Sequence, residues 1–184
     1  MTTTDPATGL TAALIERILP LKLMVFDVDG VLTDGRLYYS DDGVESKAFH
    51  TQDGQGLALL REAGIKLAII TSRRSVLVER RSRELGLHYC YQGVGAKLPT
   101  FNELLAELSL DAAQAGYMGD DLLDLPVMTR AGFAATVPDA PAAVRECAHF
   151  AARRPGGRGA VREVCELVMA GQGLLDGLIA GYLK

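Results

Sequence analysis

The sequence predicts an α/β fold built on a Rossmann-like, doubly wound parallel sheet. Short apolar runs rich in β-branched residues alternate with longer segments whose apolar residues recur at helical spacing. This alternation is typical of a parallel sheet with helices on both faces, and such sheets bind ligands at the carboxyl ends of their strands. The expected strands are 21–26, 66–70, 88–91, 115–118 and 132–136, and the expected helices are 54–63, 75–85, 98–108 and 122–129.

Length and composition indicate one domain, residues 1–184, with a full hydrophobic core. Of the 184 residues, 48% are hydrophobic, as in ordinary globular chains. The net charge of −4 argues against nucleic-acid binding, which needs a basic surface. No apolar run reaches the roughly 20 residues of a membrane span. The three cysteines are odd in number and far apart, which predicts reduced thiols and a cytoplasmic location. Residues 1–9 are polar and are expected to form a disordered leader.

Two segments depart from the alternation. Residues 36–49 predict a β-hairpin with a turn at 40–43 (SDDG), inserted directly after the first strand. The next helix follows too soon for a second domain. A short helix is expected after Ala140, and the tail, residues 153–184, contains a glycine-rich break at 156–159 (GGRG). A last helix is expected from about Ala160, with an apolar face formed by Val161, Val164, Cys165 and Val168.

Carboxylates directly follow two of the expected strands. Asp27 and Asp29 lie in the segment DVDG (27–30), and Asp120 and Asp121 follow the fourth strand, with Asp124 one turn later. Taken singly, either segment could be a turn or the acidic start of a helix. Together they would crowd several like charges at one edge of the sheet, which a divalent cation would relieve. Oxygen ligands of this kind suit Mg²⁺.

Hydroxyl and cationic side chains are expected at the same edge. Thr71, Ser72 and Arg73 follow the second strand near the start of a helix, where anions are favoured. For Ser72, a simple helix cap is the favoured alternative. Lys97 opens a helix, where its charge opposes the helix dipole, so a phosphate partner would account for its position.

The order of these motifs resembles that of the haloacid dehalogenase-like (HAD) phosphatases. The matching positions are the DVDG segment, Thr71, Lys97 and the GDD segment at 119–121, and the likeness runs from about Leu21 to the end of the chain. Within that superfamily the chain is similar to the 3-deoxy-D-manno-octulosonate 8-phosphate (KDO 8-phosphate) phosphatases, which are capless. This closer resemblance rests on the hairpin and on segments 29–35, 91–93 and 156–164.

The resemblance implies a Mg²⁺-dependent phosphatase that works through an aspartyl-phosphate. Asp27 would be the nucleophile, and Asp29 would protonate the leaving group and then activate water. Thr71 and Lys97 would hold the transferring phosphoryl group. The metal ligands would be Asp27, Asp120 and the carbonyl of Asp29, with Asp121 anchoring the metal from behind these ligands.

A small sugar-acid phosphate from lipopolysaccharide precursor synthesis is the substrate that the resemblance implies. Two positions depart from the subfamily, and they bear on the substrate rather than on the reaction class. Ser72 stands where glycine is frequent, and Ala58 where a basic residue can occur. For Arg81, a solvated position on a helix is an equal alternative. The implied substrate contacts are Asp29, His50, Thr51, Gln52, Asp53, Gly54, Ser72, Arg73, Arg81 and Lys97.

The hairpin predicts association of several subunits, and the resemblance implies that they form a homotetramer. Its apolar residues Leu37, Tyr39, Val44 and Phe49 are more than an isolated two-stranded ribbon can carry in water. Packing hairpins around a symmetry axis would bury this surface, protect the strand edges and wall each site with a neighbouring subunit. Segment 156–162, with Arg158, is a candidate second wall. The alternative is that hairpin and tail both lie on their own subunit.

Three alternatives to KDO 8-phosphate hydrolysis remain at this point. The first is a phosphatase for a related nonulosonate or another sugar phosphate. The second is a receiver-type signalling domain, but receivers place their paired acids before the phosphorylated aspartate, whereas here the acid pair follows Lys97. The third is an inactive regulatory or scaffold protein, and the presence of both Asp27 and Asp29 argues against it.

Overall fold

The structure, a computed structural model, describes residues 10–184, so the expected disordered leader at 1–9 lies outside the described part. It confirms the doubly wound α/β fold: six parallel strands form one sheet in the order β5-β4-β1-β6-β7-β8. A separate two-stranded hairpin follows β1, as expected. The sheet strands are β1 (Leu23–Phe26), β4 (Lys66–Thr71), β5 (Tyr89–Gln92), β6 (Ala115–Met118), β7 (Phe133–Thr136) and β8 (Phe150–Ala151).

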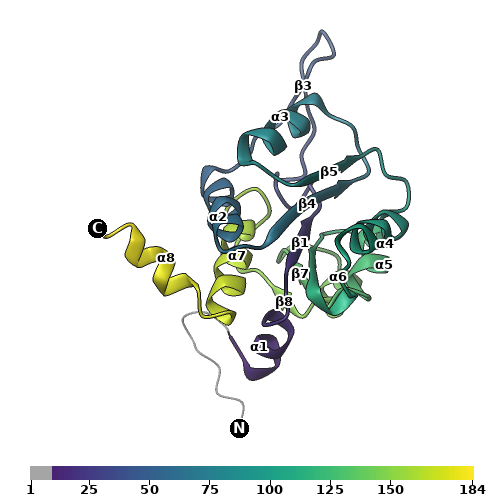
Figure 1. Cartoon of the computed structure of the whole chain (residues 1–184). Coiled ribbons are helices and arrows are strands. Elements are labelled where there is room, and N and C mark those ends of the chain that lie inside the picture. The colour runs from purple at the N-terminus through teal and green to yellow at the C-terminus, as the bar shows by residue number, and fades with distance from the viewer. Residues whose placement is uncertain (1–9) are drawn as a thin grey trace.

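Helices cover both faces of this sheet (Figure 1). The helices α1, α2 and α7 lie on one face, and α4, α5 and α6 lie on the other. Because β1 and β7 are buried along their whole length, both faces of these strands are apolar. The helices are α1 (Ala12–Ile18), α2 (Thr51–Glu62), α3 (Val76–Leu85), α4 (Lys97–Leu108), η1 (Ala112–Gln114), η2 (Leu122–Asp124), α5 (Leu125–Met128), α6 (Ala142–Cys147), α7 (Ala160–Gly171) and α8 (Leu175–Gly181).

The strand order brings the expected site residues together. Strand β1 lies between β4 and β6, and Phe26 is paired in register with Ile69 on one side and Met118 on the other. Asp27 therefore follows β1 at the same edge where β4 ends in Thr71 and where Gly119 and Asp120 follow β6.

Several elements differ from the sequence expectation. Helix α1 and strand β8 were not expected, because one is a single short amphipathic stretch and the other has only two residues. The expected helix at 122–129 is divided into η2 and α5, with a proline in the first turn of α5. The C-terminal helix ends at Gly171, and after Gly173, whose φ is +71°, a separate helix α8 begins.

The hairpin is shorter than expected and projects away from the sheet (Figure 1). Its strands β2 (Tyr38–Tyr39) and β3 (Glu45–Ser46) pair antiparallel, and Gly43 occupies the turn with a φ of +81°. Phe49, expected among the exposed apolar residues of the hairpin, instead packs against the core beneath Arg81. Leu37, Tyr39 and Val44 remain exposed.

The tail packs against its own subunit. A Cβ atom at Gly156 would lie 1.7 Å from the carbonyl oxygen of Gly30, so only glycine permits this approach to the DVDG loop. The Gly157 N–H donates to the Val31 carbonyl at 2.9 Å. No single helix within residues 10–184 is long and apolar enough to cross a membrane, and the bent pair α7 and α8 meets that test only jointly, across a 109° bend.

Candidate active site

Three aspartates gather at the carboxyl ends of β1 and β6. Ligand oxygens of Asp27, Asp120 and Asp124 all lie within 4.8 Å of one another. Asp27 follows β1 directly, Asp120 follows β6, and Asp124 is the last residue of η2. The sequence placed Asp124 one turn beyond the acid pair without giving it a role, whereas the structure buries it completely.

Lys97 lies between two of these carboxylates. Its Nζ is 2.9 Å from Asp27 Oδ2 and 2.6 Å from Asp124 Oδ1, and its side chain is 3% exposed. Burial by itself would lower the pKa of Lys97, but the charges of Asp27 and Asp124 outweigh burial and raise it. The lysine is therefore a fixed positive charge beside Asp27.

Both carboxylate oxygens of Asp124 accept hydrogen bonds from other residues of the site. Its Oδ1 also accepts from the buried Tyr117 hydroxyl at 2.6 Å, and its Oδ2 accepts from the backbone N–H groups of Asp120 and Asp121. Asp121 is exposed, and its side chain accepts from the Leu122 N–H at the start of η2. The structure thus shows Asp124 as a direct support behind the cluster, joining Lys97 and Tyr117 to the backbone of Asp120 and Asp121.

Two buried carboxylate oxygens have no hydrogen-bond partner among residues 10–184: Asp27 Oδ1 and Asp120 Oδ1. Unpartnered buried oxygens of like charge are costly, and a hard cation with oxygen ligands removes that cost. The pKa values of Asp27 and Asp120 also show that their charged forms are disfavoured. Burial, reinforced by the Asp124 charge, raises the pKa of Asp27 to about 6. Burial and the charge of Asp27 raise the pKa of Asp120 to about 7. These residues fit a magnesium ion.

Gly30 allows the DVDG loop to approach Asp120. Its φ is +93°, and a Cβ there would lie 2.0 Å from Asp120 Oδ2. Thr33 braces the same loop: its hydroxyl donates to the Val28 carbonyl and accepts from the Gly30 and Gly35 N–H groups, each at 3.3 to 3.4 Å. The DVDG loop is therefore fixed from within and against the second acidic segment.

Residues after β4 line the other side of the carboxylate cluster. Thr71, Ser72 and Arg73 share with Asp27 and Lys97 a hollow of about 200 Å³. Thr71 is buried at the end of β4, and the buried Ser72 hydroxyl has no hydrogen-bond partner in the described part of the chain. An open polar hollow between a carboxylate, a lysine and hydroxyl groups suits a phosphate group.

Asp29 points toward the hairpin rather than toward the metal cluster. Its Oδ1 is in direct contact with Lys47 Nζ, and its Oδ2 lies 3.6 Å from Arg73 Nε. Arg73 also donates to Glu45 at 2.6 Å and to the Tyr39 hydroxyl at 3.2 Å. The hairpin therefore reaches the site through charged side chains.

Protein comparisons identify the family. No protein-family model matches the chain. The KDO 8-phosphate phosphatase KdsC of Yersinia pestis is 45% identical over 163 residues, which cover 89% of this chain and 87% of that protein. KdsC of Escherichia coli K12 is 42% identical over 91% of this chain and 89% of its own length. The chain belongs to the KDO 8-phosphate phosphatase family.

Solved structures of KDO 8-phosphate phosphatases share the fold. The Moraxella catarrhalis enzyme, in complex with magnesium, phosphate and KDO, has a TM-score of 0.90 at 41% identity and covers 92% of this chain and 97% of its own. The cobalt-bound enzyme of Haemophilus influenzae has a TM-score of 0.86 at 34% identity, covering 91% of this chain and 99% of its own. The metal and phosphate in the first structure suit the carboxylates and Lys97 found here.

The start of α2 carries three of the residues that the resemblance assigns to the substrate, and they differ in exposure and partners. Thr51 is exposed, and His50 precedes the helix with a buried Nδ1 that lacks a hydrogen-bond partner among the described residues. Asp53 is 1% exposed and accepts from the Gly159 and Arg162 N–H groups, so it joins α2 to α7 and is closed to a substrate in this structure. Burial raises its pKa.

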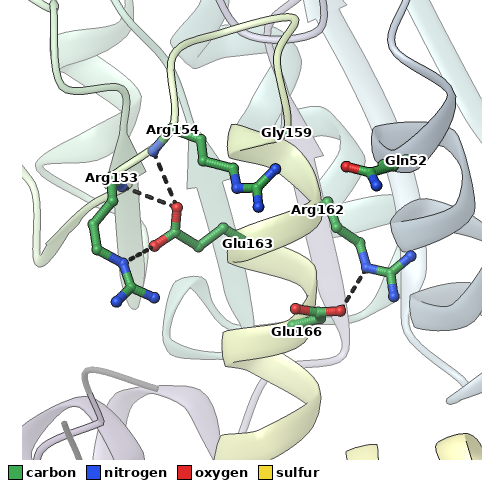
Figure 2. A pocket seen from close by; sticks show the side chains of 7 residues that line it. All are labelled: Gln52, Arg153, Arg154, Gly159, Arg162, Glu163 and Glu166. Atoms are coloured by element: carbon green, nitrogen blue, oxygen red, sulfur yellow. Dashed lines mark hydrogen bonds and ion pairs between the residues drawn. The ribbon is translucent and has the colours of Figure 1, made fainter. Parts of the chain in front are cut away.

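Gln52 and Arg81 lie away from the carboxylate hollow. Figure 2 shows Gln52 on α2 and Arg162 on α7 projecting into a separate hollow of about 390 Å³. Arg153 and Arg162 in that hollow are paired with Glu163 and Glu166. Arg81 covers the Phe49 ring at 6.0 Å, and a Cβ at Gly54 would lie 2.4 Å from its guanidinium. Gly54 thus makes room for this arginine.

Sequence reasoning gave no role to three residues of this KDO 8-phosphate phosphatase site. Tyr117 lies inside β6 and looks like any buried aromatic residue. Asp124 could have been suspected from its spacing of four residues after Asp120, which places both on one side of a helical turn. Lys47 gave no signal, because a lysine in an exposed-looking hairpin is ordinarily solvated.

Proposed function

We propose that this chain is a Mg²⁺-dependent phosphatase that converts KDO 8-phosphate to KDO and phosphate in the synthesis of lipopolysaccharide precursors. The observation that carries the proposal is the buried cluster of Asp27, Asp120 and Asp124 with Lys97 at the strand tips. The substrate follows from the KdsC relatives and from the M. catarrhalis complex with KDO.

Magnesium would be held by Asp27, Asp120 and the backbone carbonyl of Asp29, with Asp121 in a supporting position. The free oxygens of Asp27 and Asp120 support the first two ligands. Once bound, the ion neutralises charge on the phosphoryl oxygens and fixes their orientation.

The reaction begins with Asp27. One of its oxygens forms a bond to phosphorus as the bond from phosphorus to the sugar oxygen breaks, giving an aspartyl-phosphate. Asp29 gives its proton to the departing sugar oxygen. Asp29 then takes a proton from a water molecule, which attacks phosphorus and releases phosphate from Asp27. Thr71 and Lys97 hold the phosphoryl group throughout, and the fixed charge of Lys97 also keeps Asp27 oriented.

Sugar-acid recognition is assigned to the residues around this hollow. Ser72 and Arg73 line it directly, and Arg73 offers a forked cation for a carboxylate. His50 precedes α2 and Thr51 opens it, with Gly54 one turn later. Arg81 covers Phe49 away from the hollow, so it would reach the sugar acid from that side. Asp53 would act through the position of α7 and not by contact, and Gln52 would need to turn toward the site. Because Ala58 and Ser72 depart from the subfamily pattern, a related nonulosonate phosphate is the second candidate substrate.

Assembly into a homotetramer is part of the proposal. The hairpin exposes Leu37, Tyr38, Tyr39 and Val44, each between 41% and 60%, on a ribbon that stands clear of the sheet. Hairpins of neighbouring subunits would cover this surface and wall the open site. Segment 156–162 stays a candidate wall for the active site of a neighbouring subunit, although its glycines pack here on the same subunit.

A cytoplasmic location remains an expectation that rests on three unpaired cysteines.

The central test is phosphate release from KDO 8-phosphate in the presence of Mg²⁺. Asp27→Asn should leave a folded protein with activity near zero, because the amide is not a nucleophile. Asp176→Asn, the same substitution at an exposed position on α8, is the control and should retain full activity. EDTA should abolish turnover and Mg²⁺ should restore it. Substantial turnover by Asp27→Asn, or activity after exhaustive chelation, would refute the mechanism. Comparing turnover across a panel of sugar-acid phosphates separates the two candidate substrates. Light scattering measures the oligomeric state, and a monomer with full activity would refute a site completed by neighbouring subunits.

A further inference from the structure

Lys47 is a buried cation with no role in the proposed reaction so far. It follows β3 in the hairpin, and its side chain is only 2% exposed. Its Nζ contacts Asp29 Oδ1 directly and lies 3.7 Å from Glu45 Oε1. A lysine loses much of its hydration when buried, so it stays charged only where carboxylates compensate it. Lys47 is therefore fixed by its partners.

Asp29 and Lys47 belong to a closed ring of alternating charges. Asp29 contacts Lys47, Lys47 neighbours Glu45, Glu45 accepts from Arg73, and Arg73 returns to Asp29. Asp29 and Arg73 come from the loops after β1 and β4, whereas Glu45 and Lys47 come from the hairpin. The ring thus joins the hairpin to the carboxylate assigned to proton transfer.

We propose that Lys47 is a positioning residue for Asp29: it fixes one carboxylate oxygen so that the carboxyl group meets the leaving oxygen of the substrate. The hairpin then serves the chemistry of its own subunit in addition to assembly. Proton transfer depends steeply on the placement of donor and acceptor, so a loosely held Asp29 would lose efficiency without any loss of phosphate binding.

Lys47 suits this task better than Arg73. Arg73 is 41% exposed and lies 3.6 Å from Asp29, and its closest contact is to Glu45 at 2.6 Å. It can exchange partners when a substrate carboxylate arrives. Lys47 is buried and in direct contact with Asp29, so it keeps the acid in place while Arg73 is engaged elsewhere.

The inference rests on the proposed function, in which Asp29 gives its proton to the leaving oxygen as the phosphorus–oxygen bond breaks. The way in which kcat/KM changes with the leaving group therefore shows whether Lys47 assists proton transfer. A p-nitrophenolate departs without a proton, whereas a phenolate or sugar alkoxide needs one. The parameter kcat/KM covers only the steps up to this bond cleavage, so hydrolysis of the aspartyl-phosphate does not enter it.

The experiment measures kcat/KM for p-nitrophenyl phosphate and phenyl phosphate with full-length protein and Mg²⁺. Lys47→Met should lower the value for phenyl phosphate by about 10- to 100-fold and that for p-nitrophenyl phosphate by less than about threefold. Lys47→Arg, which keeps the charge, should recover part of the loss. Lys22→Met, the same change at an exposed lysine before β1, should match the unaltered protein for both substrates.

A double variant closes the argument. With Asp29→Asn already in place, adding Lys47→Met should cost no further activity, because Lys47 acts through Asp29. Lys47→Gln provides a second neutral variant if Lys47→Met folds poorly. Equal losses for both leaving groups, or additive losses in the double variant, would overturn the inference and reduce Lys47 to an anchor of the hairpin. Turnover of aryl phosphates without turnover of KDO 8-phosphate would refute the substrate assignment while leaving this test intact.

Discussion

Replacing Asp120 by asparagine should stabilise the metal-free protein at high pH. The pKa of Asp120 is about 7 and that of Asp27 about 6, both above the ordinary value of 3.8, because burial disfavours their charges and neighbouring carboxylates add to it: Asp124 for Asp27, and Asp27 with Asp124 for Asp120. The folded chain therefore holds these protons longer than the unfolded chain does. It follows that the free energy of unfolding falls as the pH rises from about 4 to about 7.

The size of the effect follows from the same shift. At 1.36 kcal/mol for each unit of pKa, the shift of Asp120 corresponds to an upper limit of about 4 kcal/mol. Asp120 is partly exposed and shares the repulsion with Asp27, so we expect Asp120→Asn to recover about 2 kcal/mol at pH 8. The gain should shrink to about 0.5 kcal/mol near pH 4, where the carboxyl groups are protonated in the folded chain and about half ionised in the unfolded chain.

Urea unfolding in EDTA at pH 4, 6 and 8 measures the effect. Asp121→Asn is the matched control: Asp121 is exposed, and asparagine caps a helix as well as aspartate does, so its stability should change little. Excess Mg²⁺ at pH 8 should stabilise the unaltered protein and leave Asp120→Asn unaffected. The account of the charge cluster would be refuted if the stability gain of Asp120→Asn over the unaltered protein were no larger at pH 8 than at pH 4.

Three further substitutions test separate parts of the site. Asp29→Asn should reduce turnover to a small residual rate but weaken Mg²⁺ binding less than Asp120→Asn, as measured by calorimetry, because Asp29 is assigned to the metal through its carbonyl; equal losses of affinity would contradict that division. Gly30→Ala should cost about 1–3 kcal/mol of stability and most of the activity, since its φ is +93° and the Cβ would overlap Asp120; unchanged kinetics would contradict the required close approach. Asp53→Ala should lower the free energy of unfolding by about 2–4 kcal/mol, because two backbone N–H groups at the start of α7 lose their acceptor; a loss below about 0.5 kcal/mol would show that Asp53 does not hold α7.

Much of the fold was predictable because hydrophobic periodicity and strand-end chemistry are local. The five expected strands all exist, and their parallel direction alone predicted that Asp27, Thr71 and Asp120 would lie at one edge of the sheet. The two-residue strand β8 and the short helix α1 carry too few residues for a periodic signal. Phe49 was expected on the exposed hairpin, but it packs on the core because α2 begins right after it.

The sequence by itself determined the α/β class, the hairpin insert and the order of the acidic, hydroxyl and lysine motifs. These features depend on residues close together in the chain, and on the rule that parallel strands end at one edge. Only the tertiary structure decided which side chains compensate which charges. Lys97 pairs with Asp124 across 27 positions, and Lys47 reaches Asp29 across 18. Such pairing depends on burial and direction, because a charge needs a partner only where the packed chain excludes water.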